Sequence, residues 1–133
     1  MSFVGNDILP IFSPPVVVPS WVDKTSSTLW TAPQGYWSTD HWQTGQPGQI
    51  LLITNGAWAS GFRPTKVKIT FTGITFLDLY VKDFSGGQTI GSISLMSGIG
   101  YDISSWVWST NMGRLDFQDT GYGSFGISKI EFQ

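Results

Sequence analysis

The stretch TKVKITFTGITFLDLYVK, residues 65–82, decides the fold class of this chain. In residues 65–72 apolar side chains alternate strictly with Lys and Thr, and residues 76–82 repeat the alternation. Because successive side chains of a β-strand point to opposite faces, this period is typical of a strand with one buried face. We therefore expect two half-buried strands whose core-facing residues are Val67, Ile69, Phe71, Leu77, Leu79 and Val81. The solvent-facing residues are expected to be Lys66, Lys68, Thr70, Asp78, Tyr80 and Lys82.

Shorter candidate strands, separated by Gly-rich turns, lie on both sides of this stretch. We expect them at residues 27–31, 49–54, 89–96, 101–109, 114–118 and 126–132. In the last of these, Lys129 and Glu131 are expected to face outward. No window of ten or more residues has helical periodicity. About eight short strands of this kind predict an all-β fold, an antiparallel β-sandwich or barrel with one packed and one solvated face per strand.

The composition fits a single domain and excludes several classes of function. The chain has 133 residues, of which 12% are charged, whereas roughly 25% is usual for a globular protein. The seven Lys and Arg are scattered and the net charge is −2, so there is no basic stripe for nucleic acid. The absence of Cys excludes disulfides and thiolate metal sites. Aromatic residues make up 15% of the chain and include seven Trp.

Residues 1–22 differ from the rest and are interpreted as an extended arm in front of a β-sandwich domain at 23–133. The arm is apolar and carries four Pro, which exclude a regular helix or a central strand. It has neither the basic start of a signal peptide nor the roughly 20 apolar residues of a membrane helix. An apolar arm must pack on its own domain or dock on a neighbouring subunit. For docking, the candidate residues are Phe3, Ile8, Leu9, Ile11, Phe12, Val16, Val17 and Val18.

No candidate catalytic or metal site emerges from the polar residues. His41 is the single histidine, and its neighbour Asp40 should point to the opposite face of a strand. Glu131 is the single glutamate, so the paired carboxylates of a glycoside hydrolase are not evident. The GYGSFG motif at 121–126 leads into a strand rather than a helix and is interpreted as a turn. A structural calcium ion, the one cofactor considered, would need oxygen ligands from Asp78, Asp83, Asp116 and Asp119.

Aromatic side chains in loop-like surroundings are the better candidates for binding. Exposed rings stack on sugars and anchor protein interfaces, whereas buried rings would simply close the ends of the sandwich. The candidate ligand-binding residues are Tyr36, Trp37, Trp42 and Trp58. Trp106 and Trp108 are expected to share one face of the strand at 101–109.

Three segments resemble the galactose-binding-like β-sandwich, the jelly roll of discoidin-type domains and of many carbohydrate-binding modules. They are WSTDHWQTGQPGQILLI at 37–53, the pairing of KVKITFTG at 66–73 with FLDLYVKD at 76–83, and GISKIEF at 126–132. The resemblance covers roughly residues 27–132. It implies a jelly roll that binds rather than catalyses, but it transfers no particular ligand residue.

The function expected from these features is a non-catalytic structural protein of a larger assembly. A single domain with an apolar arm, few charges and many aromatics favours a bacteriophage virion component, such as a capsid decoration or tail protein. Its partners would be other protein subunits, not nucleic acid or membrane, and it would be assembled in the host cytoplasm into the virion. The alternative is a carbohydrate-binding module or lectin that uses exposed Trp and Tyr.

Overall fold

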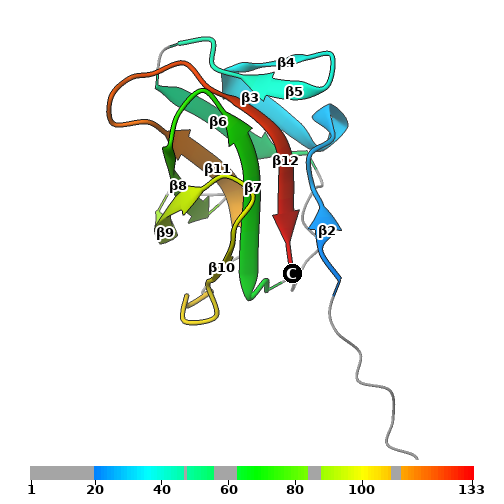
Figure 1. Cartoon of the computed structure of the whole chain (residues 1–133). Helices are drawn as coiled ribbons and strands as arrows, with labels where there is room; N and C mark the ends of the chain where they lie inside the picture. Colours follow the sequence, from blue (N-terminus) through cyan, green and yellow to red (C-terminus); the bar gives the residue numbers. More distant parts are fainter. Residues whose placement is uncertain (1–19, 47, 56–62, 84–87, 109–111) are drawn as a thin grey trace, which may run out of the picture.

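Two antiparallel β-sheets make up the fold of this chain in a computed structural model (Figure 1). The structure describes residues 20–46, 48–55, 63–83, 88–108 and 112–133. In this part of the chain there are eleven strands, no α-helix and one short 3-10 turn, η1, at Ser27–Leu29. No helix here is long and apolar enough to span a membrane. The predicted all-β sandwich is therefore confirmed.

The six-stranded sheet contains both the first and the last of the described strands. Its spatial order is β10 (Gly100–Asp102), β7 (Lys66–Thr72), β12 (Gly126–Phe132), β5 (His41–Gln43) and β4 (Tyr36–Ser38), with β2 (Val22–Asp23) also paired to β12. In the β2–β12 pair, Phe132 lies opposite Val22. The two ends of the described chain therefore meet on this sheet.

The five-stranded sheet lies behind it in Figure 1. Its spatial order is β3 (Trp30–Gln34), β6 (Gln49–Thr54), β11 (Met112–Gln118), β8 (Phe76–Asp83) and β9 (Thr89–Met96). Neighbours in space are mostly distant in sequence, so the register is fixed by long-range pairing such as Leu115 opposite Leu52 and Val81.

The core lies between the two sheets and confirms the alternation of residues 65–82. All six residues expected to face inward from the two strands are buried: Val67, Ile69, Phe71, Leu77, Leu79 and Val81. The neighbouring strands complete the layer. β11, next to β8, contributes Leu115 and Phe117, and β12, next to β7, contributes Ile130 and Phe132. Each such side chain contributes about 1.5–3 kcal/mol when it is fully buried, so this layer supplies most of the stability.

Residues 23–48 are more regular than the sequence suggests, because three strands form there. The expected strand at 27–31 is instead the η1 turn followed by β3. Two buried indoles hold this region. Trp30 Nε1 donates to the carbonyl of Lys24 at 2.7 Å, and Trp42 Nε1 donates to the carbonyl of Thr25 at 3.0 Å.

The strand expected at 101–109 is wrong beyond residue 102, where β10 ends. Asp102 Oδ1 accepts a hydrogen bond from Ser104 N at 2.8 Å and turns the chain. After the turn, Trp106 lies flat against the backbone of Gly91 in β9. The rings of Trp106 and Trp108 are 6.2 Å apart, but they do not share a strand face.

Glu131 lies on the outer side of the six-stranded sheet, opposite Lys68, as predicted. It is not exposed to solvent as an outward residue would be, because only 8% of its surface is accessible. The ammonium groups of Lys68 and Lys129 approach its carboxylate at 3.7 and 3.8 Å. The outward assignment is therefore right in direction and wrong in exposure.

Residues 1–19 of the N-terminal arm lie outside the described residues. This applies to every residue of the expected docking surface: Phe3, Ile8, Leu9, Ile11, Phe12, Val16, Val17 and Val18. The domain boundary at residue 23 stays a prediction.

Candidate functional site

The solvent-facing side of the five-stranded sheet, called the outer face below, carries the densest set of polar groups around an aromatic ring. Residues directly opposite one another on neighbouring strands point to the same side, so the register arranges this face in rows. One row is Ser94, Asp78, Gln118 and Gln49. The central row is Ser92, Tyr80, Asp116, Leu51 and Gln34. The third row is Lys82, Arg114, Ile53 and Thr31.

Asp116 lies at the centre of the outer face and is only 3% exposed. Gln49 Nε2 donates to its Oδ1 and Gln118 Nε2 donates to its Oδ2, each at 2.9 Å. Lys82 Nζ lies 3.3 Å from Oδ2. Hydrogen bonds to a charged group contribute about 1.5–3 kcal/mol each, so Asp116 holds three side chains from three strands in fixed positions. The face is thus ordered before anything binds to it.

Arg114 brings a second cation to the same end of the face, directly opposite Lys82. Its Nε is buried and has no hydrogen-bond partner in the described part of the chain. A buried donor without a partner costs about 1–3 kcal/mol, and native structures contain few of them. The carboxylate nearest in the rows, Asp116, already accepts from both glutamines and pairs with Lys82.

A shallow open pocket of about 250 Å³ lies over β8 and β9. Its lining residues are Asp78, Leu79, Tyr80, Ser92, Ile93 and Ser94. A carboxylate, two hydroxyls and a phenol ring line this hollow, which makes it suitable for a polar ligand that also has an apolar side. In the described residues no group of three or more His, Cys, Asp or Glu side chains could hold a metal ion.

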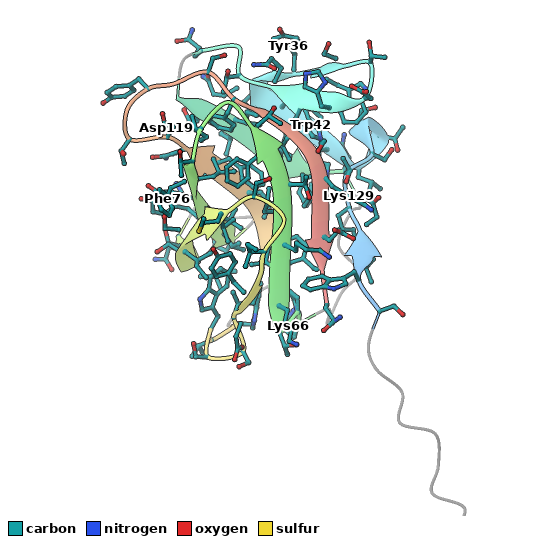
Figure 2. All side chains as sticks on the ribbon, viewed as in Figure 1. Tyr36, Trp42, Lys66, Phe76, Asp119 and Lys129 are labelled. Carbon is teal, nitrogen blue, oxygen red and sulfur yellow. The ribbon has the colours of Figure 1, made fainter. Side chains whose placement is uncertain are left out.

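The aromatic residues singled out from the sequence lie on the other sheet. Tyr36 and Trp37 belong to β4 and Trp42 to β5, at the end of the molecule farthest from Lys66, and Figure 2 shows Tyr36 well apart from Phe76. Trp42 is 2% exposed, and the half-buried Trp37 packs edge-on against it at 5.2 Å. Trp42 is therefore not an exposed ring, whereas ligand binding by this group of aromatic residues stays a prediction. Tyr36 is 52% exposed, and Trp58 lies outside the described residues.

The acidic residues considered for calcium are not brought together. Asp116 is bound to Lys82 and two glutamines, as described above. Asp83 Oδ1 accepts from Gln88 N at 3.1 Å, and Asp119 Oδ2 accepts from Gly123 N at 2.7 Å in a separate loop. The Asp119 contact also shapes the GYGSFG segment, which leads into β12 as predicted.

His41 and Asp40 contact each other, although their side chains were expected to point to opposite faces of a strand. Nδ1 of His41 lies 2.8 Å from Oδ1 of Asp40. Asp40 belongs to the turn before β5 and not to the strand, so the alternation of strand side chains does not apply to it. The pair is formed on the six-stranded sheet and contributes nothing to the outer face.

Sequence reasoning assigned Asp78, Tyr80 and Lys82 to the solvent side but did not recognise them as part of a site. Their spacing is the signal that could have found it, because an aromatic ring between two opposite charges on one strand face has no packing role. Arg114 and Asp116 have the same spacing on β11, but only the strand pairing shows that they lie beside Tyr80 and Lys82.

Solved structures of family 29 carbohydrate-binding modules share this fold. A mutant complexed with mannohexaose has a TM-score of 0.59 at 14% sequence identity, covering 87% of this chain and 92% of that chain. A mutant complexed with cellulohexaose has a TM-score of 0.58 at 14% identity, covering 85% and 89%. Another structure of the module has a TM-score of 0.57 at 15% identity, covering 85% and 87%.

No protein-family model matches the sequence, and no curated protein matches it either. At such low identity, similarity to the modules establishes the fold alone. It confirms the expected likeness to carbohydrate-binding sandwiches. It gives no support to a bacteriophage origin.

Proposed function

We propose that this domain is a non-catalytic binding module that holds a polysaccharide on the outer face of its five-stranded sheet. The observation that carries the proposal is the central group of this face: the Tyr80 ring beside the open pocket, with Asp78, Lys82 and the Asp116 network around it. A sugar ring has an apolar C–H side and a rim of hydroxyls. It therefore needs an aromatic surface together with fixed donors and acceptors.

The network around Asp116 supports this proposal energetically. Lys82, Gln49 and Gln118 are already held by the carboxylate, so little side-chain freedom remains to be lost when a ligand binds. Ordering one long side chain costs about 0.5–1.5 kcal/mol at an interface, and preorganisation avoids that cost. Arg114 adds guanidinium donors beside this ordered group.

The fold comparisons favour the same function. The similar modules are carbohydrate-binding by name, and two of the mutants were complexed with hexasaccharides. Those neighbours are named for binding, in agreement with a non-catalytic role here. The virion role expected from the arm has no such support, and residues 1–19 of the arm lie outside the described residues.

Binding can be tested by affinity electrophoresis in gels that contain a soluble glucan or mannan, followed by calorimetric titration with cellohexaose and mannohexaose. Tyr80→Ala should weaken binding by about fivefold or more, as expected for loss of an aromatic anchor. Tyr36→Ala removes a more exposed ring from the other sheet and should change affinity little. If Tyr36→Ala abolishes binding while Tyr80→Ala does not, the site is on β4 and the proposal is wrong.

A further inference from the structure

Phe76 extends the outer face beyond the pocket. It is the first residue of β8 and has the same parity as Asp78, Tyr80 and Lys82, so it points to the same side of the sheet. Its side chain is 57% exposed. Met96 lies directly opposite on β9 and is 45% exposed. Figure 2 shows Phe76 at the side of the molecule, apart from Tyr36 of β4.

We propose that the ligand is an extended polysaccharide chain lying along β8, with Phe76 as its second stacking ring. This inference rests on the proposed function and specifies its ligand, which must be long enough to reach from Tyr80 to Phe76. Four residues of a strand separate the two rings, a distance of about 13 Å at roughly 3.3 Å per residue. A short oligosaccharide in the pocket would contact Tyr80 alone.

The polar groups between Tyr80 and Phe76 favour a polysaccharide chain that lies along β8. Asp78 lies midway on the same strand face, and Ser94 lies directly opposite it on β9. Both line the open pocket, which therefore extends from Tyr80 to the residue pair next to Phe76 and Met96. Hydroxyls of a sugar chain passing over the pocket would find an acceptor and a hydroxyl partner along its length.

A polysaccharide chain lying across the strands would find fewer suitable contacts than one lying along β8. From Tyr80 the neighbouring residue of the central row is Asp116, which is almost inaccessible and already has three partners. The next residue is the apolar Leu51. A chain lying across the strands would pass Gln118 and Arg114, but the central row offers it no second aromatic ring to stack on after Tyr80.

Phe76 and Met96 also form an exposed apolar strip across β8 and β9. A single exposed apolar side chain is common and needs no explanation. Here two of them are cross-strand neighbours, at the end of the face that also carries the pocket and Tyr80. Continuity with that face identifies the strip as part of the same binding surface.

The test is a calorimetric titration of the full chain with cello- and manno-oligosaccharides of two to six units. The unaltered protein should bind the hexasaccharide more tightly than the disaccharide. Phe76→Ala should weaken binding of the hexasaccharide about fivefold or more and leave the disaccharide unchanged, so that the dependence on length is reduced. Phe76→Tyr, which keeps an aromatic ring, should bind the hexasaccharide as tightly as the unaltered protein does. Val107→Ala removes a more exposed apolar side chain elsewhere and should have no effect on either ligand.

Two results would overturn the inference. If Tyr80→Ala weakens binding but Phe76→Ala leaves the hexasaccharide affinity unchanged, the polysaccharide site stands and its extension along β8 is wrong. If the unaltered protein binds no oligosaccharide or polysaccharide, the proposed function and the extension are both wrong. Thermal unfolding monitored by circular dichroism should show that Phe76→Ala is folded, as expected for so exposed a side chain.

Discussion

Replacing Gly91 with alanine should destabilise the domain, because the Trp106 ring occupies the position that a Cβ atom would need. A Cβ on Gly91 would lie 2.2, 2.3 and 2.7 Å from three atoms of that ring. The backbone cannot easily retreat, since Gly91 pairs with Val81 in the β8–β9 ladder. The ring itself must therefore move.

The size of the effect follows from the geometry. Ordinary contact begins at 3.4 Å, so the nearest ring atom must shift by at least 1.2 Å from its present 2.2 Å. The indole would then lose much of its contact with the core it packs against. Overpacking of this kind costs about 1–3 kcal/mol, and we expect a loss of about 2 kcal/mol in the free energy of unfolding.

Urea unfolding followed by tryptophan fluorescence and circular dichroism measures this loss. Gly45→Ala is a matched control, because its Cβ would meet only ordinary contacts from 3.6 Å outward and its backbone has no positive φ. In a Trp106→Ala background the same Gly91→Ala change should be neutral or slightly stabilising, since alanine restricts the unfolded chain more than glycine does. The reasoning is refuted if Gly91→Ala and Gly45→Ala have equal effects, or if the penalty persists without Trp106.

Three further outcomes are expected. Asp116→Ala should cost about 2–3 kcal/mol in urea unfolding because it leaves an ammonium and two amides without their acceptor, whereas Asp78→Ala on the same face should cost less than about 0.5 kcal/mol; equal costs would contradict the central network. Trp42→Phe should cost about 1–3 kcal/mol because a buried carbonyl loses its donor, and a neutral effect would count against the indole hydrogen bond. Hydrogen bonds from the Ser104 side chain and backbone hold the pKa of Asp102 below its ordinary value of 3.8, so this carboxylate stabilises the fold above that pH and the contribution disappears as the pH falls through the lowered pKa. Ser104→Ala should raise the pKa of Asp102 in an NMR titration, and an unchanged value would contradict this assignment.

The sequence predicts the core better than it predicts the site. In β7 and β8 the alternation identifies every buried apolar residue, because a strand with one wet face must alternate. The same rule fails after Asp102, where a side chain caps a turn and the chain leaves the sheet. It also fails for the exposure of Glu131, because two lysines cover its carboxylate. The alternation of a strand predicts to which face of the sheet a side chain points. How much of that side chain is exposed depends on neighbouring residues, which only the folded structure shows.

Only the part of the site on β8 could be predicted, because the other residues come from separate strands. Tyr80 and Asp116 are far apart in the chain and become neighbours only through the β8–β11 register. The sequence instead drew attention to the aromatic cluster between residues 36 and 42, where local density is high. Trp42 shows why density misleads: its indole is needed to hold the segment at Thr25 and is therefore buried.

The pairing of β2 with β12 has a practical consequence for how the domain can be handled. Both described chain ends lie on the six-stranded sheet, with Phe132 opposite Val22, while the outer face belongs to the opposite sheet (Figure 1). A tag, a fluorescent fusion or a linkage to a sensor chip joined to Gln133, which follows β12, would therefore start from the sheet opposite Tyr80 and Phe76. Immobilised in this orientation, every molecule would present the same side to the solution.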